Sequence, residues 1–246
     1  MNILTIIPAR IGSKGIPQKN LLKIGRYTLI ERALFLAINS ENIDDIVVST
    51  DSKKIQNIVN KYGNHSLFIR PKELATDDAG SLGVIQHSLL WAEKNYNKKY
   101  NYIVLIEPPS PFRLPEHVKQ GIEIAIQKKA TSVVSLVEVG DYHPIRMKEM
   151  NSEGRLKGAV SDEPDGLRRQ EQKPLYIRNC AVYIFSCKTI KENKLWGEKP
   201  YGFEMEKNLY GINIDEPSDY SAAKILYREM KTKNNVDQIE TIINNI

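Results

Sequence analysis

A cationic, glycine-containing segment directly follows the first short apolar run of the chain. The run at 3–8 leads into ARIGSKGIPQKN, where Arg10, Lys14 and Lys19 bring three positive charges close together. Two glycines permit a tight backbone, and Ser13 and the main-chain amides can donate hydrogen bonds. A polyphosphate requires this combination of flexible backbone, aimed donors and positive charge. The residues alone fit a triphosphate-binding loop and, equally, a surface turn with solvated lysines.

The elements that must position this loop can be predicted from apolar periodicity. Strands are expected at 3–8, 45–50, 67–70, 102–106, 131–139, 175–186 and 209–214. Helices are expected at 28–38, 52–62, 81–95, 116–129 and 217–230. This order predicts an α/β fold, with a mostly parallel sheet and helices on both faces. Such sheets bind ligands beyond the carboxyl ends of their strands, which is where the cationic loop begins.

One domain is expected over 1–230, with an inserted arm at about 140–174 and a C-terminal tail at 231–246. The arm segment is polar and shows no sustained periodicity. A structureless loop of that length is improbable in a compact domain, so we expect it to fold against a ligand or a second subunit. The tail is rich in Asn and Lys and is expected to fray.

Composition and spacing exclude several classes of function. The net charge is +5, but Lys and Arg are spread along the chain without a nucleic-acid-binding motif, so we expect no nucleic acid. The loop spacing is neither GxxxxGK[ST] nor GxGxxG. No apolar run is long enough for a membrane helix or a signal peptide, which predicts a cytoplasmic protein without membrane contact. Cys180 and Cys187 lack metal-ligand spacing and are expected to be reduced.

The segment PARIGSKGIPQKN at 8–20 resembles the signature of the acylneuraminate cytidylyltransferases, which are the CMP-sialic acid synthetases. Further segments follow in family order up to about residue 228: RPKELATDDAGS (70–81), EPPSPFR (107–113), HPIRMK (143–148), RRQ (168–170), RNCAVYI (178–184) and NIDEPSDY (213–220). The resemblance implies a Rossmann-like nucleotidyltransferase fold with a dimerisation insertion. It also implies transfer of the cytidylyl group of CTP to an acidic nine-carbon sugar, with release of pyrophosphate, in lipopolysaccharide or capsule biosynthesis.

The resemblance also implies a role for each matching residue. The triphosphate would be bound by Arg10, Ser13 and Lys14, with Lys19 beside them. The cytidine would be held by Asn20, Arg70 and Ser81. The sugar would be bound by Glu107, Arg146, Arg169, Asn179 and Tyr183. The residues expected to take part in catalysis are Arg10, Lys14 and Asp215, which stabilise developing charge together with Mg²⁺ or Mn²⁺.

The metal-binding motif departs from the family pattern. The family usually carries two aspartates spaced D-x-D before the last helix, and this chain has Asn213 and Asp215. An amide offers an oxygen without negative charge, so metal binding should be weaker than with two carboxylates. Asp215 is the expected ligand, with Asn213 as a second one.

Two further departures concern the sugar. Glu107 replaces the amide of the family's QPTSP, and Cys180 replaces a common glycine. A carboxylate would accept from an extra hydroxyl or pair with an ammonium, and it would repel an anion. A related nonulosonate such as legionaminate, pseudaminate or a deaminated form therefore remains open beside N-acetylneuraminate. Cys180 is expected to be a packing thiol.

Three alternatives remain at this stage. A 3-deoxy-octulosonate cytidylyltransferase would share the fold, but typically has Arg where GSKG has Lys. A nucleotide-binding protein without turnover is favoured by the impaired metal site at Asn213. The loop alone does not distinguish CTP from another nucleotide such as GTP. The family forms homodimers whose arm reaches over the neighbouring active site, so Arg146 would serve the partner.

Overall fold

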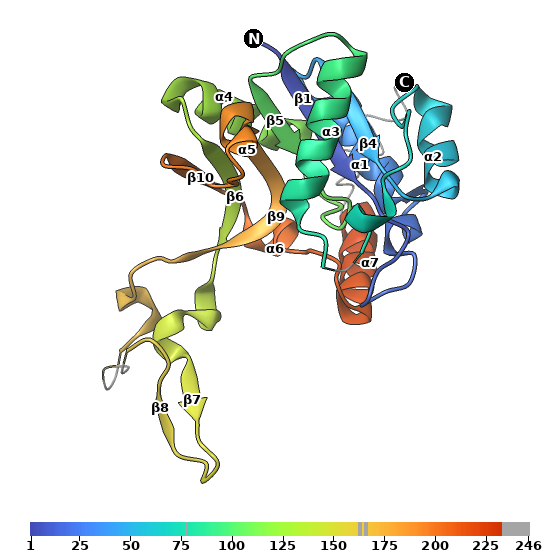
Figure 1. Ribbon diagram of the computed structural model, residues 1–246. Coiled ribbons are helices and arrows are strands. Elements are labelled where there is room, and N and C mark those ends of the chain that lie inside the picture. The colour runs from blue at the N-terminus through green and yellow to red at the C-terminus, as the bar shows by residue number, and fades with distance from the viewer. Residues whose placement is uncertain (77, 162–163, 165–166, 233–246) are drawn as a thin grey trace.

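The computed structural model describes residues 1–232, except residues 77, 162–163 and 165–166 (Figure 1). Most of the predicted tail, from residue 233 onward, lies outside the described residues. Within the described ranges, no helix combines the length and apolar character needed to cross a bilayer. Cys180 and Cys187 are both free thiols, as predicted.

A central sheet of six strands has the order β10-β6-β9-β5-β1-β4. The strands are β1 (Ile3–Pro8), β4 (Asp45–Ser49), β5 (Tyr102–Leu105), β6 (Ser132–Glu138), β9 (Tyr176–Ser186) and β10 (Pro200–Glu204). β1 pairs in parallel with β4 and β5, and β10 pairs in parallel with β6. β9 is antiparallel to both of its neighbours. The prediction of a mostly parallel sheet is confirmed.

The antiparallel direction of β9 follows from the inserted arm. β6 leaves the sheet, the chain runs out through the arm, and β9 returns beside β6. An outward and a returning strand that lie side by side are necessarily antiparallel, whereas parallel neighbours need a crossover. The arm therefore replaces the crossover helix that would otherwise link these two strands.

Helices cover both faces of the sheet, as predicted. The helices are α1 (Leu29–Ile38), α2 (Lys53–Val59), α3 (Ser81–Asn95), α4 (Pro115–Lys128), α5 (Cys187–Lys191), α6 (Lys207–Tyr210) and α7 (Pro217–Thr232). Side chains alternate along β1, so that Ile3 and Ile7 pack with α1, α2 and α4 while Leu4 and Ile6 pack with α3. Figure 1 shows α3 in front of the sheet in this view.

Apolar side chains form one cluster on each face of the sheet, and a third apolar cluster joins the end of the described chain to its beginning. Ala223 and Tyr227 of α7 pack with Ile24 and Leu29, next to the short hairpin of β2 (Lys23–Ile24) and β3 (Tyr27–Thr28). Thr28 and Glu31 form a capping box that starts α1 directly after this hairpin. α7 is thus anchored beside the strand that follows the cationic loop.

Two predicted strands are wrong. Residues 67–70 run beside the end of β4, where Arg70 N donates to Thr50 O at 2.7 Å. The carbonyls of Ser66 and Phe68 accept hydrogen bonds from Gln56 Nε2 instead of from a neighbouring strand, so no ladder forms. Residues 209–214 instead contribute to the short helix α6 and an extended segment. Their apolar side chains pack against Ala223 and Tyr227 of α7. These residues are therefore apolar because they are buried, although they do not pair with another strand.

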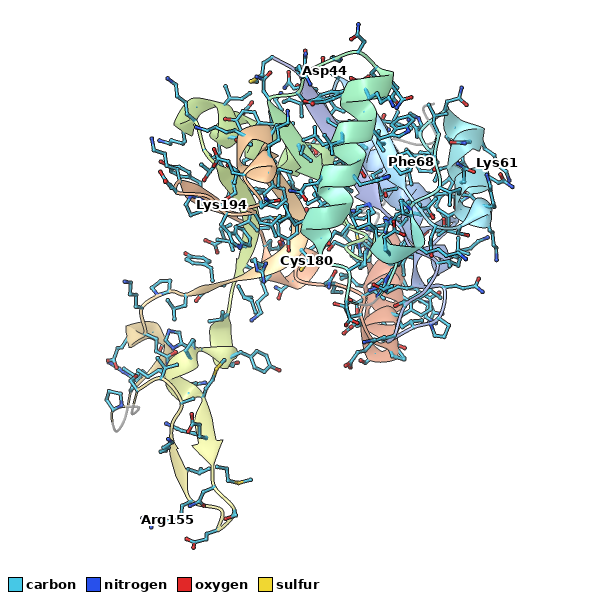
Figure 2. All side chains as sticks on the ribbon, in the orientation of Figure 1. Asp44, Lys61, Phe68, Arg155, Cys180 and Lys194 are labelled. Atoms are coloured by element: carbon cyan, nitrogen blue, oxygen red, sulfur yellow. The ribbon has the colours of Figure 1, made fainter. Side chains whose placement is uncertain are left out.

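The arm is folded and projects away from the body (Figure 1). It contains an antiparallel hairpin of β7 (Lys148–Met150) and β8 (Leu156–Gly158), with 3-10 turns at 140–142, 144–146 and 169–171. Figure 2 places Arg155 at the tip of this hairpin. Met150 is 72% exposed and the opposing Leu156 is 64% exposed, whereas Glu149 and Lys157 form an ion pair. Because side chains alternate in strands, Met150 and Leu156 share one face of the hairpin with Lys148, and the ion pair lies on the other face.

The cationic loop and the segment before α7 approach each other at Gly15. A Cβ added to Gly15 would lie 2.1 Å from the backbone oxygen of Asp215, whereas one at Gly12 would meet nothing within 4 Å. We expect Gly15→Ala to lower the free energy of unfolding by about 1–3 kcal/mol, because the backbone must move apart. Urea unfolding measures this, with Gly12→Ala as the matched control. Equal stabilities of the two variants would contradict the contact.

A carboxylate on α3 also ties this helix to α5. Glu93 is 5% exposed and accepts from Lys99 Nζ at 2.9 Å and Lys191 Nζ at 2.8 Å. Burial acts to raise the pKa of Glu93, but hydrogen bonds and charges from both lysines outweigh it and lower the pKa below 4.5. The ionised carboxylate therefore stabilises the fold above the unfolded-state pKa, and this contribution is lost as the pH falls through the folded-state pKa.

We expect Glu93→Gln to lower the free energy of unfolding by about 1–3 kcal/mol at neutral pH, since a buried charged hydrogen-bond acceptor is removed. The difference from wild type should shrink and vanish as the pH falls below the folded-state pKa. Urea unfolding at a series of pH values checks this, with Glu123→Gln on the exposed side of α4 as the control. A difference that persists unchanged in acid would refute it.

Candidate active site

A cleft of about 360 Å³ opens at the carboxyl ends of β1, β4 and β5. Eight of the residues predicted to form the site line it: Arg10, Lys19, Asn20, Arg70, Ser81, Glu107, Asn213 and Asp215. These residues come from four separate parts of the chain, and the parallel arrangement of β1, β4 and β5 brings their following loops to one edge. Figure 2 shows Cys180 near the N-terminal end of α3, and both line this cleft.

The cationic loop is anchored on both sides. Ile11 N donates to Asp51 Oδ1 at 2.8 Å, which ties the loop to the end of β4. Asn20 Nδ2 donates to the carbonyl of Arg10 at 2.8 Å and closes the loop on itself. Lys19 Nζ lies 2.7 Å from Asp215 Oδ1, which ties the loop to the segment before α7. The loop therefore holds Arg10 and Lys19 at the cleft. Ser13 and Lys14 lie on the same loop, outside the lining of the cleft.

The side of the cleft next to β4 and α3 is largely apolar. Its apolar lining consists of Leu74, Ala79, Val84, Ile85 and Leu105. Arg70 is buried here, with Nε donating to Ser49 Oγ at 3.0 Å and Nη1 reaching the Leu74 carbonyl at 3.5 Å. Burial lowers the pKa of Arg70, the charge of Asp51 opposes this decrease and the charge of Arg10 adds to it, and the result is a pKa of about 10. Arg70 thus fixes the segment that covers this apolar surface.

The opposite end of the cleft is acidic. Glu107 follows β5 directly, and burial raises its pKa while Arg113 and Lys19 oppose the increase. Asp215 is 61% exposed at its side chain and accepts from Lys19 and from Asn213 Nδ2. Asp219 Oδ2 accepts from Asp215 N at 2.9 Å, which holds the segment at the start of α7.

These oxygens fit a divalent cation that is completed by substrate. Mg²⁺ is commonly held by one or two carboxylates together with phosphate oxygens and water. The carboxylate of Asp215 and the amide of Asn213 lie on one wall, and Glu107 lines the same cleft. The amide nitrogen of Asn213 now faces Asp215, so this amide would have to turn to offer its oxygen to the same ion. Among the described residues, no group of three His, Cys, Asp or Glu side chains is gathered as a ready-made metal site. Lys19 now occupies one oxygen of Asp215, so a metal would require this lysine to turn away.

Three of the predicted sugar-binding residues, Arg146, Asn179 and Tyr183, do not line the cleft of this chain. Arg146 and Arg169 lie on the arm, and Arg146 Nη1 is 3.2 Å from Asp141 Oδ1. Asn179 and Tyr183 lie on β9 with buried side chains. Burial raises the pKa of Tyr183, and a hydrogen bond with Cys180 adds to this increase.

Two features of the site were missed in the sequence. Cys180, expected to be a packing thiol, lines the cleft and adopts the left-handed backbone conformation (φ 57°). The common glycine at this position of the motif was a signal for that backbone, because glycine favours positive φ. The loop after β5 also contributes Pro108 and Pro109 to the lining, and only their place after a strand pointed to the site.

Comparisons with known proteins identify the family of this chain. The family model described as Cytidylyltransferase matches residues 4–242. The CMP-N,N'-diacetyllegionaminic acid synthase of Legionella pneumophila is 31% identical over 231 residues, which cover 92% of this chain and 96% of that protein. The N-acylneuraminate cytidylyltransferase of Streptococcus agalactiae is 33% identical over 89% of this chain. The match covers 52% of that protein, so this chain spans about half its length.

Solved structures show the same fold at lower identity. A CMP:2-keto-3-deoxy-manno-octonic acid synthetase complexed with CTP has a TM-score of 0.67 and 14% identity, covering 93% of this chain and 99% of that chain. The 4-diphosphocytidyl-2C-methyl-D-erythritol synthase of Anaerococcus prevotii has a TM-score of 0.62 and 15% identity, covering 92% and 96%. The resemblance seen in the motifs is thus confirmed: this chain belongs to the cytidylyltransferase family and is a nucleotidyltransferase.

Proposed function

We propose that this enzyme transfers the cytidylyl group of CTP to an acidic nine-carbon sugar of the sialic-acid type and releases pyrophosphate. The observation that carries the proposal is one cleft in which Arg10 and Lys19 face Asp215 and Asn213 beside an apolar surface. This combination suits a nucleoside triphosphate: cations for the phosphates, acidic and amide oxygens for a metal, and apolar side chains for a base. Relatives of this chain are named for legionaminic, neuraminic and pseudaminic acids.

The nucleotide would lie across the carboxyl edge of the sheet. Its phosphates would follow the loop of Arg10, Ser13, Lys14 and Lys19, because main-chain amides and cations converge there. The cytosine would rest on the apolar side near α3, with Asn20, Ser81 and the segment held by Arg70 around it. The apolar side chains that line this side of the cleft favour a planar base over a charged group.

A magnesium or manganese ion would complete the site. Asp215 would hold it, with Asn213 and Glu107 as the neighbouring oxygen donors. When bound, the ion supplies positive charge to the phosphate oxygens and orients the leaving pyrophosphate. Lys19 would then leave Asp215 and turn toward the phosphates, which lie on its own loop. Asn213 brings no negative charge, so the ion should bind more weakly than it would between two aspartates.

The chemical step would be one in-line displacement. The anomeric hydroxyl oxygen of the sugar bonds to the α-phosphorus, the bond from the α-phosphorus to the bridging oxygen of pyrophosphate breaks, and the hydroxyl proton is released. Arg10 and Lys14 would neutralise the charge that develops on the phosphate oxygens. Phosphoryl transfer depends mainly on positioning and charge neutralisation, so the cleft needs no nucleophilic side chain.

The acceptor would occupy the end of the cleft next to β5. Glu107 stands there in place of an amide, and a carboxylate accepts hydrogen bonds but cannot donate them when ionised. This favours a sugar that presents N–H or O–H groups to Glu107, such as a diacylated nonulosonate. We further propose a cytoplasmic enzyme whose CMP-linked product feeds lipopolysaccharide or capsule synthesis.

Pyrophosphate release tests the reaction directly. With CTP, Mg²⁺ and a panel of nonulosonic acids, we expect release with at least one acid and a CMP-linked product. Asp215→Ala should reduce kcat/KM by about 100-fold or more, because the variant would no longer hold the metal ion that neutralises charge in the transition state. Glu123→Ala on the exposed side of α4 is the matched control. Release from none of the acids, with CTP still bound, would leave a nucleotide-binding protein without turnover.

A magnesium titration in the same assay examines Asn213. We expect Asn213→Asp to reach half-maximal activity at a lower magnesium concentration than wild type. An unchanged or higher concentration would show that Asn213 is not beside the ion.

We also propose a homodimer in which the arm covers the partner's cleft. The hairpin exposes Met150 and Leu156 on one face and pairs Glu149 with Lys157 on the other. An exposed apolar face on a projecting hairpin is stabilised by burial against another surface. Arg146 and Arg169 lie on the same arm, where they would reach the acceptor of the partner subunit.

Charges placed on the apolar face should separate the subunits. We expect the double variant Met150→Glu, Leu156→Glu to be a monomer with greatly reduced activity, because apolar burial is lost. The double variant Glu149→Gln, Lys157→Gln on the opposite face is the control and should remain a dimer. Sedimentation equilibrium gives the mass, and pyrophosphate release gives the activity. A wild-type monomer with full activity would refute the shared site.

A further inference from the structure

A bulge interrupts β9 where this strand meets the cleft. Val134 pairs with Tyr183 and Leu136 pairs with Arg178, so four residues of β9 lie opposite Ser135 alone. These four residues are Asn179, Cys180, Ala181 and Val182, three more than a regular pairing would place there. Bulges redirect side chains and often occur next to active sites. This bulge therefore determines which side chains of β9 point toward the cleft.

Two buried side chains hold the bulge. Asn179 is 4% exposed, and its Oδ1 lies 2.6 Å from Ser135 Oγ, which donates to it. Val182 N donates to Ser135 Oγ at 2.8 Å. Asn179 Nδ2 donates to the carbonyl of Tyr210 at 3.1 Å. The amide of Asn179 is thus engaged within the protein, on both its oxygen and its nitrogen.

The bulge directs Cys180 into the cleft. The residue adopts φ 57°, a conformation that costs a non-glycine residue about 1–3 kcal/mol and persists where the surroundings enforce it. Its thiol is hydrogen-bonded to Tyr183, which lies beneath the cleft wall. Ser110 Oγ lies 3.1 Å from the Cys180 carbonyl and 3.4 Å from Asn213 Oδ1. The bulge is thereby connected to the segment that carries Asp215.

Cys180 stands on the acceptor side of the cleft. The apolar surface near α3 suits the base, and the loop after β1 suits the phosphates. The remaining wall is built by Glu107 after β5, by Cys180 of β9 and by Asn213 and Asp215. A group that reacts with the α-phosphate must approach from this wall, because the other sides are taken by the nucleotide.

We infer that Asn179 and Ser135 are positioning residues that hold the bulge, and that Cys180 determines which acceptor fits. The inference rests on the proposed function, since it concerns the acceptor of that reaction. Asn179 acts through the bulge, because its amide bonds Ser135 and Tyr210. Cys180 limits the space that a glycine at the same position would leave free.

Cys180→Gly tests the specificity, because glycine adopts this backbone conformation without strain. The acceptors are a parent nonulosonic acid and acids lengthened by one carbon at each acyl group in turn. For each lengthened acid, the acceptor ratio is its kcat/KM divided by the kcat/KM of the parent acid. We expect this ratio to be roughly tenfold higher in Cys180→Gly than in wild type for at least one acid, because the variant frees space for about one extra carbon in the pocket. Cys180→Ser, of similar size, should keep the wild-type ratio. CTP should retain its KM in both variants.

Cys187→Ala is the matched control, since this second thiol is buried at the start of α5, away from the cleft lining. It should leave the acceptor ratio unchanged. If wild type is active but Cys180→Gly leaves every ratio unchanged, the inference is wrong while the proposed function stands. If wild type releases no pyrophosphate with any acid, the proposed function itself fails.

Ser135→Ala tests the positioning role. We expect the KM for the sugar acid to rise severalfold while the KM for CTP stays constant, and Ser135→Thr, which keeps the hydroxyl, to restore part of the loss. A purely structural role would lower the melting temperature and affect both substrates equally. That outcome, or an unchanged KM for the sugar acid, would overturn the assignment of Ser135 and Asn179.

Discussion

The ion pair between Lys19 and Asp215 joins the two ends of the fold at the place where chemistry is expected. Their Nζ and Oδ1 atoms lie 2.7 Å apart, although the residues are separated by most of the chain. The pair is partly exposed, so its own contribution to stability is small. Its importance is geometric, because the close approach at Gly15 keeps the cationic loop against the segment before α7. The third apolar cluster, with α7 beside the first hairpin, supports this closure.

The rest of the cleft depends on the direction of the strands around this contact. β1, β4 and β5 are parallel, so the loops after β1 and β5 bring Arg10 and Glu107 to one edge, where Arg70 is held beside the end of β4 by the bond from Arg70 N to Thr50 O. β9 enters from the arm in the opposite direction and therefore reaches this edge with its beginning. The same insertion that projects the hairpin also supplies the cleft wall. A change in the arm and a change in the acceptor wall are therefore linked through one strand.

Much of the fold could be predicted because local signals agreed with tertiary packing. α3 occupies the predicted residues 81–95, and α1 starts at a capping box that is visible in the sequence. β10 was missed because PYGFE lacks an apolar run and includes proline and glycine, which suits an edge strand. The apolar run at 209–214 suggested a strand, but it is buried against α7, and burial alone produces the same pattern.

The candidate site was predictable where motifs fall on loops after strands. Arg10 and Lys19 after β1 and Glu107 after β5 are such cases. The environment of Asn179 could not be predicted, because its partner Ser135 lies within an apolar strand and carries no signal of its own. The sequence also does not show which subunit an arm residue serves. Long-range pairing and assembly decide these points, and neither leaves a periodic pattern in the chain.

Lys19 is the counterion of Asp215 in this structure. If the phosphates attract Lys19, they also free an oxygen of Asp215 for the divalent cation. Conversely, the cation displaces Lys19 toward the phosphates. Nucleotide and metal would then each raise the affinity of the other by the same factor, as thermodynamic linkage requires. Under the proposed function, Lys19 would thus couple the binding of nucleotide and of metal through the single carboxylate of Asp215.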